Sequence, residues 1–260
     1  MNLKKIESVF FSVLDDISDY LPNLTLVGGW MPHIYSNFLW KTTVRNPVTT
    51  VDIDFGVDQS VPGDYPKTIF EVLSSLDYKE RHLETGKMFP VVMQKDKIPV
   101  EFITYPLVDI NIIEKMVGSQ IYINKIDKFD FLLKHRIPIE IRSKKNSKTY
   151  LVNCPKPSAF LYHKGATFIE REDAKKKAKD LHYIYFILRY APDIDRILEE
   201  ISEYRKKECL VHVLDNMNMF FERISSKGCL LVEEENGADE YVYDLRQDIY
   251  ERFKKLREVL

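Results

Sequence analysis

The character of the sequence changes once, in the Pro-punctuated segment 153–158 (NCPKPS), and this change constrains the fold more than any other feature. Before it, apolar runs with the two-residue period of strands alternate with runs of helical period. After it, helical period dominates, and we expect helices at 159–171, 174–190, 194–204, 210–224 and 244–260. Alternating strands and helices are typical of an α/β sheet. We therefore predict an α/β (α+β) domain with a mixed sheet over residues 1–155 and an all-helical domain over residues 156–260.

Spacing and turn signals also position the elements of the first half. Helices are expected at 3–20, 31–39 and 69–76, and strands at 24–27, 50–57, 88–93 and 98–105. The charged turn 94–97 joins the last two strands. In the second half, we expect the acidic stretch 233–240 to be a solvated loop.

Composition excludes several classes of protein. The 260 residues carry 38 Lys and Arg against 40 Asp and Glu, so the chain as a whole is neither a polybasic nucleic-acid coat nor an acidic tail. No apolar run approaches the roughly 20 residues of a membrane span, and the start lacks the apolar stretch of a secretory signal. The three cysteines are widely spaced and form no CxxC motif. We expect a cytoplasmic protein with no membrane partner.

Positive charge is concentrated in the middle of the chain. Residues 134–179 hold 13 Lys and Arg against 4 Asp and Glu, a local charge of +9, which leaves −11 for the remainder. Such asymmetry would let this segment attract a polyanion. The alternative is that Lys175, Lys176 and Lys177 only form a solvated helix face.

The strand expected at 50–57 carries two acids, Asp52 and Asp54, among apolar residues. Because side chains alternate along a strand, both carboxylates should stand on the face opposite the core. Two neighbouring carboxylates repel unless one is protonated or a cation lies between them, and Mg²⁺ is commonly held by carboxylates together with substrate phosphates. The pair therefore indicates a metal site, against the alternative of a half-exposed strand that happens to carry two aspartates.

Two further features accompany this acidic strand. Gly28 and Gly29 follow a strand and precede a helix, where glycine lets the backbone approach a ligand and a helix N-terminus can receive a phosphate, although such a pair is also an ordinary turn. Glu101 lies alone among apolar residues in the strand 98–105 and would share the face of the aspartates if the strands are adjacent.

In this order, the three features resemble the nucleotidyltransferase superfamily: a glycine turn after the first strand, an acid–apolar–acid strand, and a third carboxylate on a later strand. The spacing from Gly29 to Asp52, 23 positions, is longer than usual for the superfamily and would accommodate an inserted loop. The resemblance implies that Asp52, Asp54 and Glu101 hold Mg²⁺ and that Gly28 and Gly29 admit the phosphates of a nucleoside triphosphate.

A second resemblance lies in the helical half. The segments FLYHKGATF (160–168), with Arg171 beyond, and KDLHYIY (179–185) look like the Lys…Arg…(Lys/Arg)-Asp-Leu pattern of the AbiEii-type (MenT-like) toxin nucleotidyltransferases. This implies that Lys164 and Asp180 join the catalytic site and that Lys164 and Arg171 bind the nucleotide. Arg171 would lie two helical turns after Lys164, on the same face. The alternative is a structural salt bridge between Lys164 and Asp180 on neighbouring helices.

The leading hypothesis is a Mg²⁺-dependent nucleotidyltransferase that moves a nucleoside monophosphate from a nucleoside triphosphate to an acceptor hydroxyl. Resemblance to the toxins implies transfer RNA or another RNA as acceptor and a cognate antitoxin as partner. Two alternatives remain open, namely a small-molecule or protein acceptor and a catalytically silent binding or regulatory module of the same fold. The sequence contains no HxxxH, HxH or GxSxG motif, which disfavours zinc and covalent hydrolase chemistry.

Overall fold

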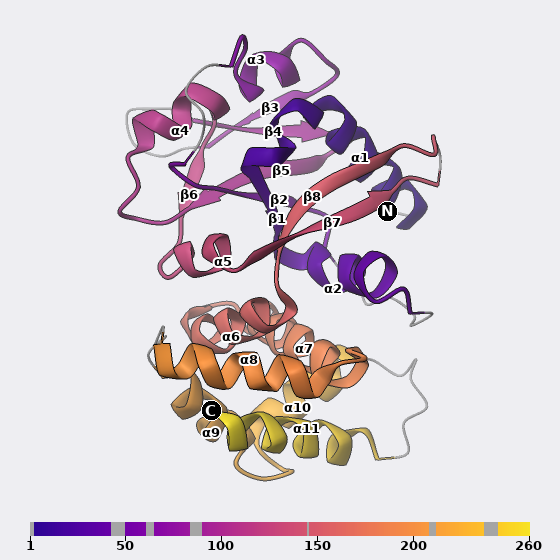
Figure 1. Ribbon diagram of the computed structural model, residues 1–260, viewed down its shortest axis with the longest axis vertical. Coiled ribbons are helices and arrows are strands. Elements are labelled where there is room, and N and C mark those ends of the chain that lie inside the picture. The colour runs from indigo at the N-terminus through magenta and orange to yellow at the C-terminus, as the bar shows by residue number, and fades with distance from the viewer. Residues whose placement is uncertain are drawn as a thin grey trace. The chain divides into compact units, whose positions relative to one another are not determined.

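The computed structural model describes residues 3–42, 50–60, 65–83, 90–144, 146–207, 212–236 and 244–260 (Figure 1). The chain divides into two compact units. Unit 1 comprises Met1–Ile34 and Val48–Pro155, and unit 2 comprises Tyr35–Pro47 and Lys156–Leu260. None of the helices in the described part of the chain is long and apolar enough to cross a membrane.

Unit 1 is built on a mixed sheet that has eight strands among the described residues. Seven follow the order β3-β4-β5-β2-β1-β8-β7, and β6 pairs with β5. The strand β2 lies at the centre, antiparallel to β1 and parallel to β5. The bounds are β1 (Leu24–Val27), β2 (Ile53–Val57), β3 (Lys79–His82), β4 (Val91–Lys95), β5 (Ile98–Thr104), β6 (Ile123–Lys125), β7 (Arg136–Arg142) and β8 (Thr149–Pro155).

The described residues of unit 1 also form five α-helices. They are α1 (Leu3–Asp16), α2 (Met31–Ile34), α3 (Ile69–Ser74), α4 (Ile110–Val117) and α5 (Asp130–Lys134). The end of α1 is tied to two distant parts of the sheet, because Asp15 pairs with Lys148 just before β8 at 2.7 Å and Asp16 pairs with Lys95 on β4 at 2.6 Å. Its apolar side is buried, so α1 lies across several strands and closes the core on one side.

The two faces of β2 have different neighbours. Ile53, Phe55 and Val57 are buried, and the ring of Phe55 stacks on that of Phe102 of β5, with centroids 6.1 Å apart. On the opposite face lies Gly56, where a Cβ atom would stand 2.7 Å from the side chain of Leu133 on α5. This close packing leaves no room for a side chain at position 56, and α5 therefore covers this end of the face that also carries Asp54.

From Lys156 onward, the regular elements within the described residues are helices. They are α6 (Pro157–Thr167), a 3₁₀-helix (Phe168–Glu170), α7 (Ala174–Tyr190), α8 (Ile194–Lys207), α9 (Val213–Phe221), α10 (Lys227–Asn236) and α11 (Leu245–Val259). All residues of α6 are buried, so α6 is the central helix of unit 2. Its Gly165 allows close packing, since a Cβ atom there would lie 3.0 Å from Val213 of α9.

Several predicted elements differ from the observed ones at their ends. The expected helix 159–171 stops at Thr167, because Asp173 caps the next helix by accepting a hydrogen bond from the Lys175 backbone N–H at 2.8 Å. The strand expected from residue 50 begins at Ile53, so Asp52 lies just outside it. The expected helix 31–39 continues from Tyr35 as a π-helix.

The acidic stretch 233–240 was wrongly expected to be a loop. Residues 233–236 form the last turn of α10, whose Cys229 and Val232 are buried, and residues 237–240 lie outside the described part of the chain. Because α10 has few apolar positions and ends in an acidic run, its sequence has no clear helical period of apolar residues.

The segment after α2 belongs to unit 2, although the sequence analysis assigned it to the first domain. Tyr35 contacts the ring of Phe160 edge-on at 6.0 Å, and Trp40 stacks on Phe186 at 6.3 Å. These aromatic contacts with α6 and α7 explain the assignment of the described residues 35–42.

Candidate active site

Two of the three predicted carboxylates lie side by side on adjacent central strands. Asp54 of β2 is in register with Glu101 of β5 on one side and with Val27 of β1 on the other. Residues in register across a sheet point to the same face. Asp54 and Glu101 are both half-buried, so this pair forms an acidic row on one face of the sheet, opposite the Phe55 face.

Asp52 is exposed and precedes β2 by one residue. Its backbone is fixed by Trp30, whose indole N–H donates to the Asp52 carbonyl oxygen at 3.0 Å. Trp30 is fully buried and stacks on Phe10 of α1, with centroids 4.1 Å apart. The position of Asp52 therefore depends on a packed tryptophan that comes directly after the two glycines.

The turn after β1 makes room for the carboxylate of Asp54. Gly28 has a φ of +73°, and a Cβ atom there would lie 1.9 Å from Asp54 Oδ2. Both the backbone conformation and the space thus require glycine. Beyond the turn, which is a 3₁₀-helix (Gly28–Trp30), the expected helix 31–39 is present as the four residues of α2 followed by the π-helix Tyr35–Leu39. The neighbouring Gly29 is buried.

His33 of α2 contributes no positive charge near this turn at neutral pH. It lies beside Trp30, with ring centroids 5.5 Å apart, and is buried. Burial, assisted by the charge of Lys144, lowers the pKa of His33 to about 4. Any cation that balances the acidic row must therefore come from elsewhere.

The donor chemistry of the row fits Mg²⁺ bound together with a phosphate ligand. Carboxylate oxygens are hard donors, and Mg²⁺ is usually held by one or two carboxylates plus substrate phosphates and water. Within the described residues, no group of three His, Cys, Asp or Glu side chains is arranged to hold a metal ion. The carboxylates of the described residues therefore form no closed protein metal centre, and a metal at the row would need further ligands from a substrate or water.

One basic residue that sequence reasoning missed contacts this row. The guanidinium Nη2 of Arg81, on β3, lies 3.7 Å from Glu101 Oε1. The four residues of β3 are all polar and exposed, so this strand has no apolar period from which it could be predicted. Pairing with Glu101 is visible only once the order of the strands is known.

The predicted residues of the helical half form a buried cluster within unit 2. Lys164 Nζ of α6 donates to Asp180 Oδ1 of α7 at 2.5 Å, and Arg171 Nε donates to Asp180 Oδ2 at 3.0 Å. The side chains of Lys164 and Asp180 are 10% and 6% exposed, whereas that of Arg171 is 40% exposed. The expectation that Arg171 shares a helix face with Lys164 is wrong, because α6 ends at Thr167; both reach the same carboxylate from different segments.

The charges of this cluster depend on each other. Burial alone raises the pKa of the Asp180 carboxyl, but the positive charges of Lys164 and Arg171 and their hydrogen bonds outweigh burial and hold that pKa below its ordinary value. Asp180 is therefore ionised at neutral pH, and the three side chains carry a net charge of about +1, most accessible at Arg171.

The basic segment 134–179 is divided between the two units and is partly neutralised. Among its described members, Lys148 pairs with Asp15, Lys156 pairs with Glu200, and Lys164 and Arg171 both pair with Asp180. On α7, Lys175 and Lys176 are exposed. Burial raises the pKa of Glu235 on α10, and the charges of Lys179 and Lys175 oppose this effect, so α10 brings acidic charge close to the basic start of α7.

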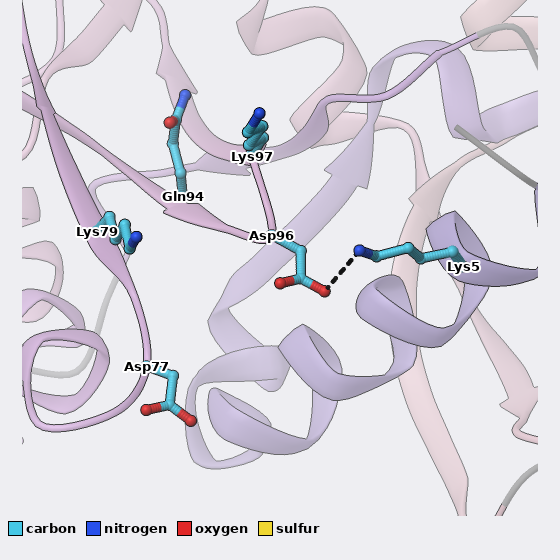
Figure 2. A pocket seen from close by; sticks show the side chains of 6 residues that line it. All are labelled: Lys5, Asp77, Lys79, Gln94, Asp96 and Lys97. Atoms are coloured by element: carbon cyan, nitrogen blue, oxygen red, sulfur yellow. Dashed lines mark ion pairs between the residues drawn. The ribbon is translucent and has the colours of Figure 1, made fainter.

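Figure 2 shows a pocket at the edge of the sheet, with a volume of about 370 Å³. It is lined by Lys5, Asp77, Lys79, Gln94, Asp96 and Lys97. Lys5 and Asp96 form an ion pair across it at 3.5 Å. It contains none of the predicted site residues and has mixed charge.

Comparisons with known proteins show the family to which the chain is similar. A family model described as a nucleotidyltransferase matches residues 11–195, more than half of the chain. No curated protein matches. Among solved structures, the chain is similar to an antigenic nucleotidyltransferase-like protein from Paracoccidioides brasiliensis, with a TM-score of 0.44 and 12% sequence identity over 83% of this chain and 94% of that chain.

Proposed function

The chain belongs to the nucleotidyltransferase family, and from this premise we propose that it transfers a nucleoside monophosphate from a nucleoside triphosphate to an acceptor hydroxyl with the help of Mg²⁺. One observation carries the proposal. The glycine turn at Gly28 packs against Asp54, and Asp54 is in register with Glu101, so a turn able to approach phosphate meets two carboxylates at one place.

In the proposed reaction, the acceptor hydroxyl oxygen attacks the α-phosphorus. The bond between that phosphorus and the oxygen bridging to the β-phosphate breaks, and pyrophosphate leaves with the electron pair. The hydroxyl proton passes to the carboxylate of Glu101 or to water. Negative charge grows on the phosphate oxygens during this step, and preorganised positive charge stabilises it.

Asp52 and Asp54 are the residues that would hold the metal, and Glu101 would complete its coordination or act as the base. A bound Mg²⁺ supplies charge stabilisation and orients the triphosphate. Without a cation, these carboxylates would repel the triphosphate. Trp30 supports the arrangement by holding the backbone at Asp52.

We assign the cluster of unit 2 to nucleotide binding in the same reaction. Arg171 is its most exposed cation, and the planar guanidinium suits a phosphate. Asp180 orients Arg171 through the hydrogen bond to Nε, and Lys164 keeps Asp180 ionised. A purely structural salt bridge between Lys164 and Asp180 would have the same geometry. Only the kinetics of variants distinguishes this salt bridge from a role in nucleotide binding.

For the acceptor, we propose an RNA end, in the manner of the AbiEii-type toxins, with an antitoxin as partner in the cytoplasm. The exposed lysines at the start of α7 favour a polyanion, since Lys and Arg gain by releasing condensed counterions. A small hydroxyl compound or a protein side chain is the second candidate acceptor. A silent module is less favoured, because a chain without catalysis has no need for Asp54 and Glu101 side by side.

The test is incubation of the purified chain with each α-labelled nucleoside triphosphate, Mg²⁺ and total cellular RNA. Label in RNA supports the RNA acceptor, and label in protein or a small compound supports the second candidate. The label should disappear with EDTA and in Asp54→Asn. The matched control is Asp77→Asn, which removes the same charge from an exposed turn of unit 1 and should label normally. No label with any triphosphate or acceptor would refute the proposal.

A further inference from the structure

Arg81 lies at the edge of the sheet and reaches the acidic row from there. It is in register with Val92 of β4, and β4 lies between β3 and β5. Its side chain is 50% exposed, whereas that of its partner Glu101 is 34% exposed. The arginine therefore spans the neighbouring strand to contact a carboxylate that faces away from the core.

The same carboxylate has a second potential partner. Glu101 is in register with Asp54, so a cation held by Asp54 would attract Glu101 as well. Coulomb attraction to a divalent ion competes with attraction to a guanidinium, since one carboxylate cannot satisfy both at full strength.

We propose that Arg81 is a positioning residue that serves as the counter-ion of Glu101 in the metal-free site and releases this carboxylate when a divalent cation binds. The proposal rests on the proposed function, because it assumes a cation at Asp52 and Asp54. Arg81 thus lowers the metal affinity of the free protein while it screens the repulsion between Glu101 and Asp54.

The experiment measures Mn²⁺ binding by the whole protein, from the paramagnetic resonance signal of the free ion. Arg81→Met keeps a long apolar side chain and removes the charge. Lys79→Met is the matched control, because it removes one positive charge two residues away on the same strand. An exposed ion pair is worth up to about 1 kcal/mol, so we expect Arg81→Met to bind Mn²⁺ about two- to five-fold more tightly than Lys79→Met does.

A double-mutant cycle then tests whether Arg81 acts through Glu101. In a Glu101→Gln background, Arg81→Met should have no larger effect than Lys79→Met, because the competition has been removed. Urea unfolding of each variant checks that the fold is retained. A cycle without coupling, or equal Mn²⁺ affinity in Arg81→Met and Lys79→Met, would overturn the proposal.

Failure of this proposal is distinguishable from failure of the proposed function. If the wild-type protein binds Mn²⁺ and Asp54→Asn abolishes that binding, the metal site stands whatever Arg81 does. If the wild-type protein binds no Mn²⁺ even with a non-hydrolysable nucleoside triphosphate, both proposals are refuted together.

Discussion

Gly28 and Asp54 occupy adjoining space so closely that a single methyl group at position 28 would stand 1.9 Å from Asp54 Oδ2. Gly28 and Asp54 are 26 positions apart in sequence, yet the position of the Asp54 carboxylate leaves no room for a side chain at position 28. A left-handed backbone at Gly28 turns the chain, and the missing side chain lets the carboxylate lie against that turn.

Gly28→Ala should therefore lose both stability and nucleotide transfer. Strain at positive φ costs about 1 kcal/mol or more, and displacement of Asp54 disturbs the proposed metal ligands. Gly118→Ala is the matched control, since Gly118 also has a positive φ (+99°) and a close neighbour, Phe70. Urea unfolding and label transfer measure the two effects. Equal loss of transfer in both variants would show that Gly28 acts on stability alone.

Asp54→Asn should abolish transfer without unfolding the protein. Asp54 and Glu101 are like charges in register, and such pairs are destabilising, so the free energy of unfolding should stay the same or rise by about 0.5 kcal/mol. Chemical denaturation and single-turnover labelling measure both quantities. A large loss of stability would instead assign the carboxylate a structural role.

Trp30→Phe should separate the hydrogen bond to Asp52 from the packing of the ring. Removing the indole N–H leaves the Asp52 carbonyl without this donor and should cost about 1 kcal/mol of stability. We expect transfer to fall further than in Phe10→Leu, a variant that loosens the ring stack but keeps the indole donor. If both variants have the same catalytic rate, the bond to Asp52 does not position the site.

Lys164→Met should destabilise the protein by about 3 kcal/mol, because removing one member of a buried ion pair leaves Asp180 poorly compensated. Arg171→Gln, at the more exposed partner, should cost about 1 kcal/mol or less. If the cluster binds the nucleotide, Arg171→Gln will nevertheless raise the KM for the triphosphate. Wild-type kinetics in that variant would leave only the salt-bridge interpretation.

The Lys164 pair also has a pH signature. The folded-state pKa of Asp180 is below its ordinary value of 3.8, so between the two values the folded state binds fewer protons than the unfolded state. The stabilisation is complete above about pH 4 and is lost as the pH falls through the folded pKa. Acid denaturation curves of Lys164→Met should therefore be shallower in this range than those of the wild type.

Neutralising Lys175, Lys176 and Lys177 to alanine should weaken RNA labelling at moderate salt and leave triphosphate binding unchanged. Each lost contact to single-stranded RNA should reduce the slope of log affinity against log salt by about 0.7. Arg205, Lys206 and Lys207 at the end of α8 form a control triplet of equal charge. Unchanged labelling in the α7 variant would favour the small-molecule acceptor.

Local pattern was enough to determine part of this protein. The glycine turn and the helix 174–190 depend on neighbouring residues, and the structure has the turn and α7 where those patterns placed them. The alternation around Asp54 likewise predicted a strand, although β2 begins at Ile53 and leaves Asp52 just outside it. The end of the helix after Lys164 was misjudged, because the cap at Asp173 competes with further helix.

Only the tertiary structure decided which of these residues meet. Register between β2 and β5 brought Glu101 beside Asp54, and strand order brought Arg81 to Glu101, although β3 has no apolar period. Because α6 is buried on all sides, the charge of Lys164 needs a buried partner, which Asp180 of α7 provides. The sequence by itself determines which residue types lie on each helix or strand. Their interaction partners follow from long-range packing, because a buried or crowded charge is stable only where the fold supplies its counter-charge.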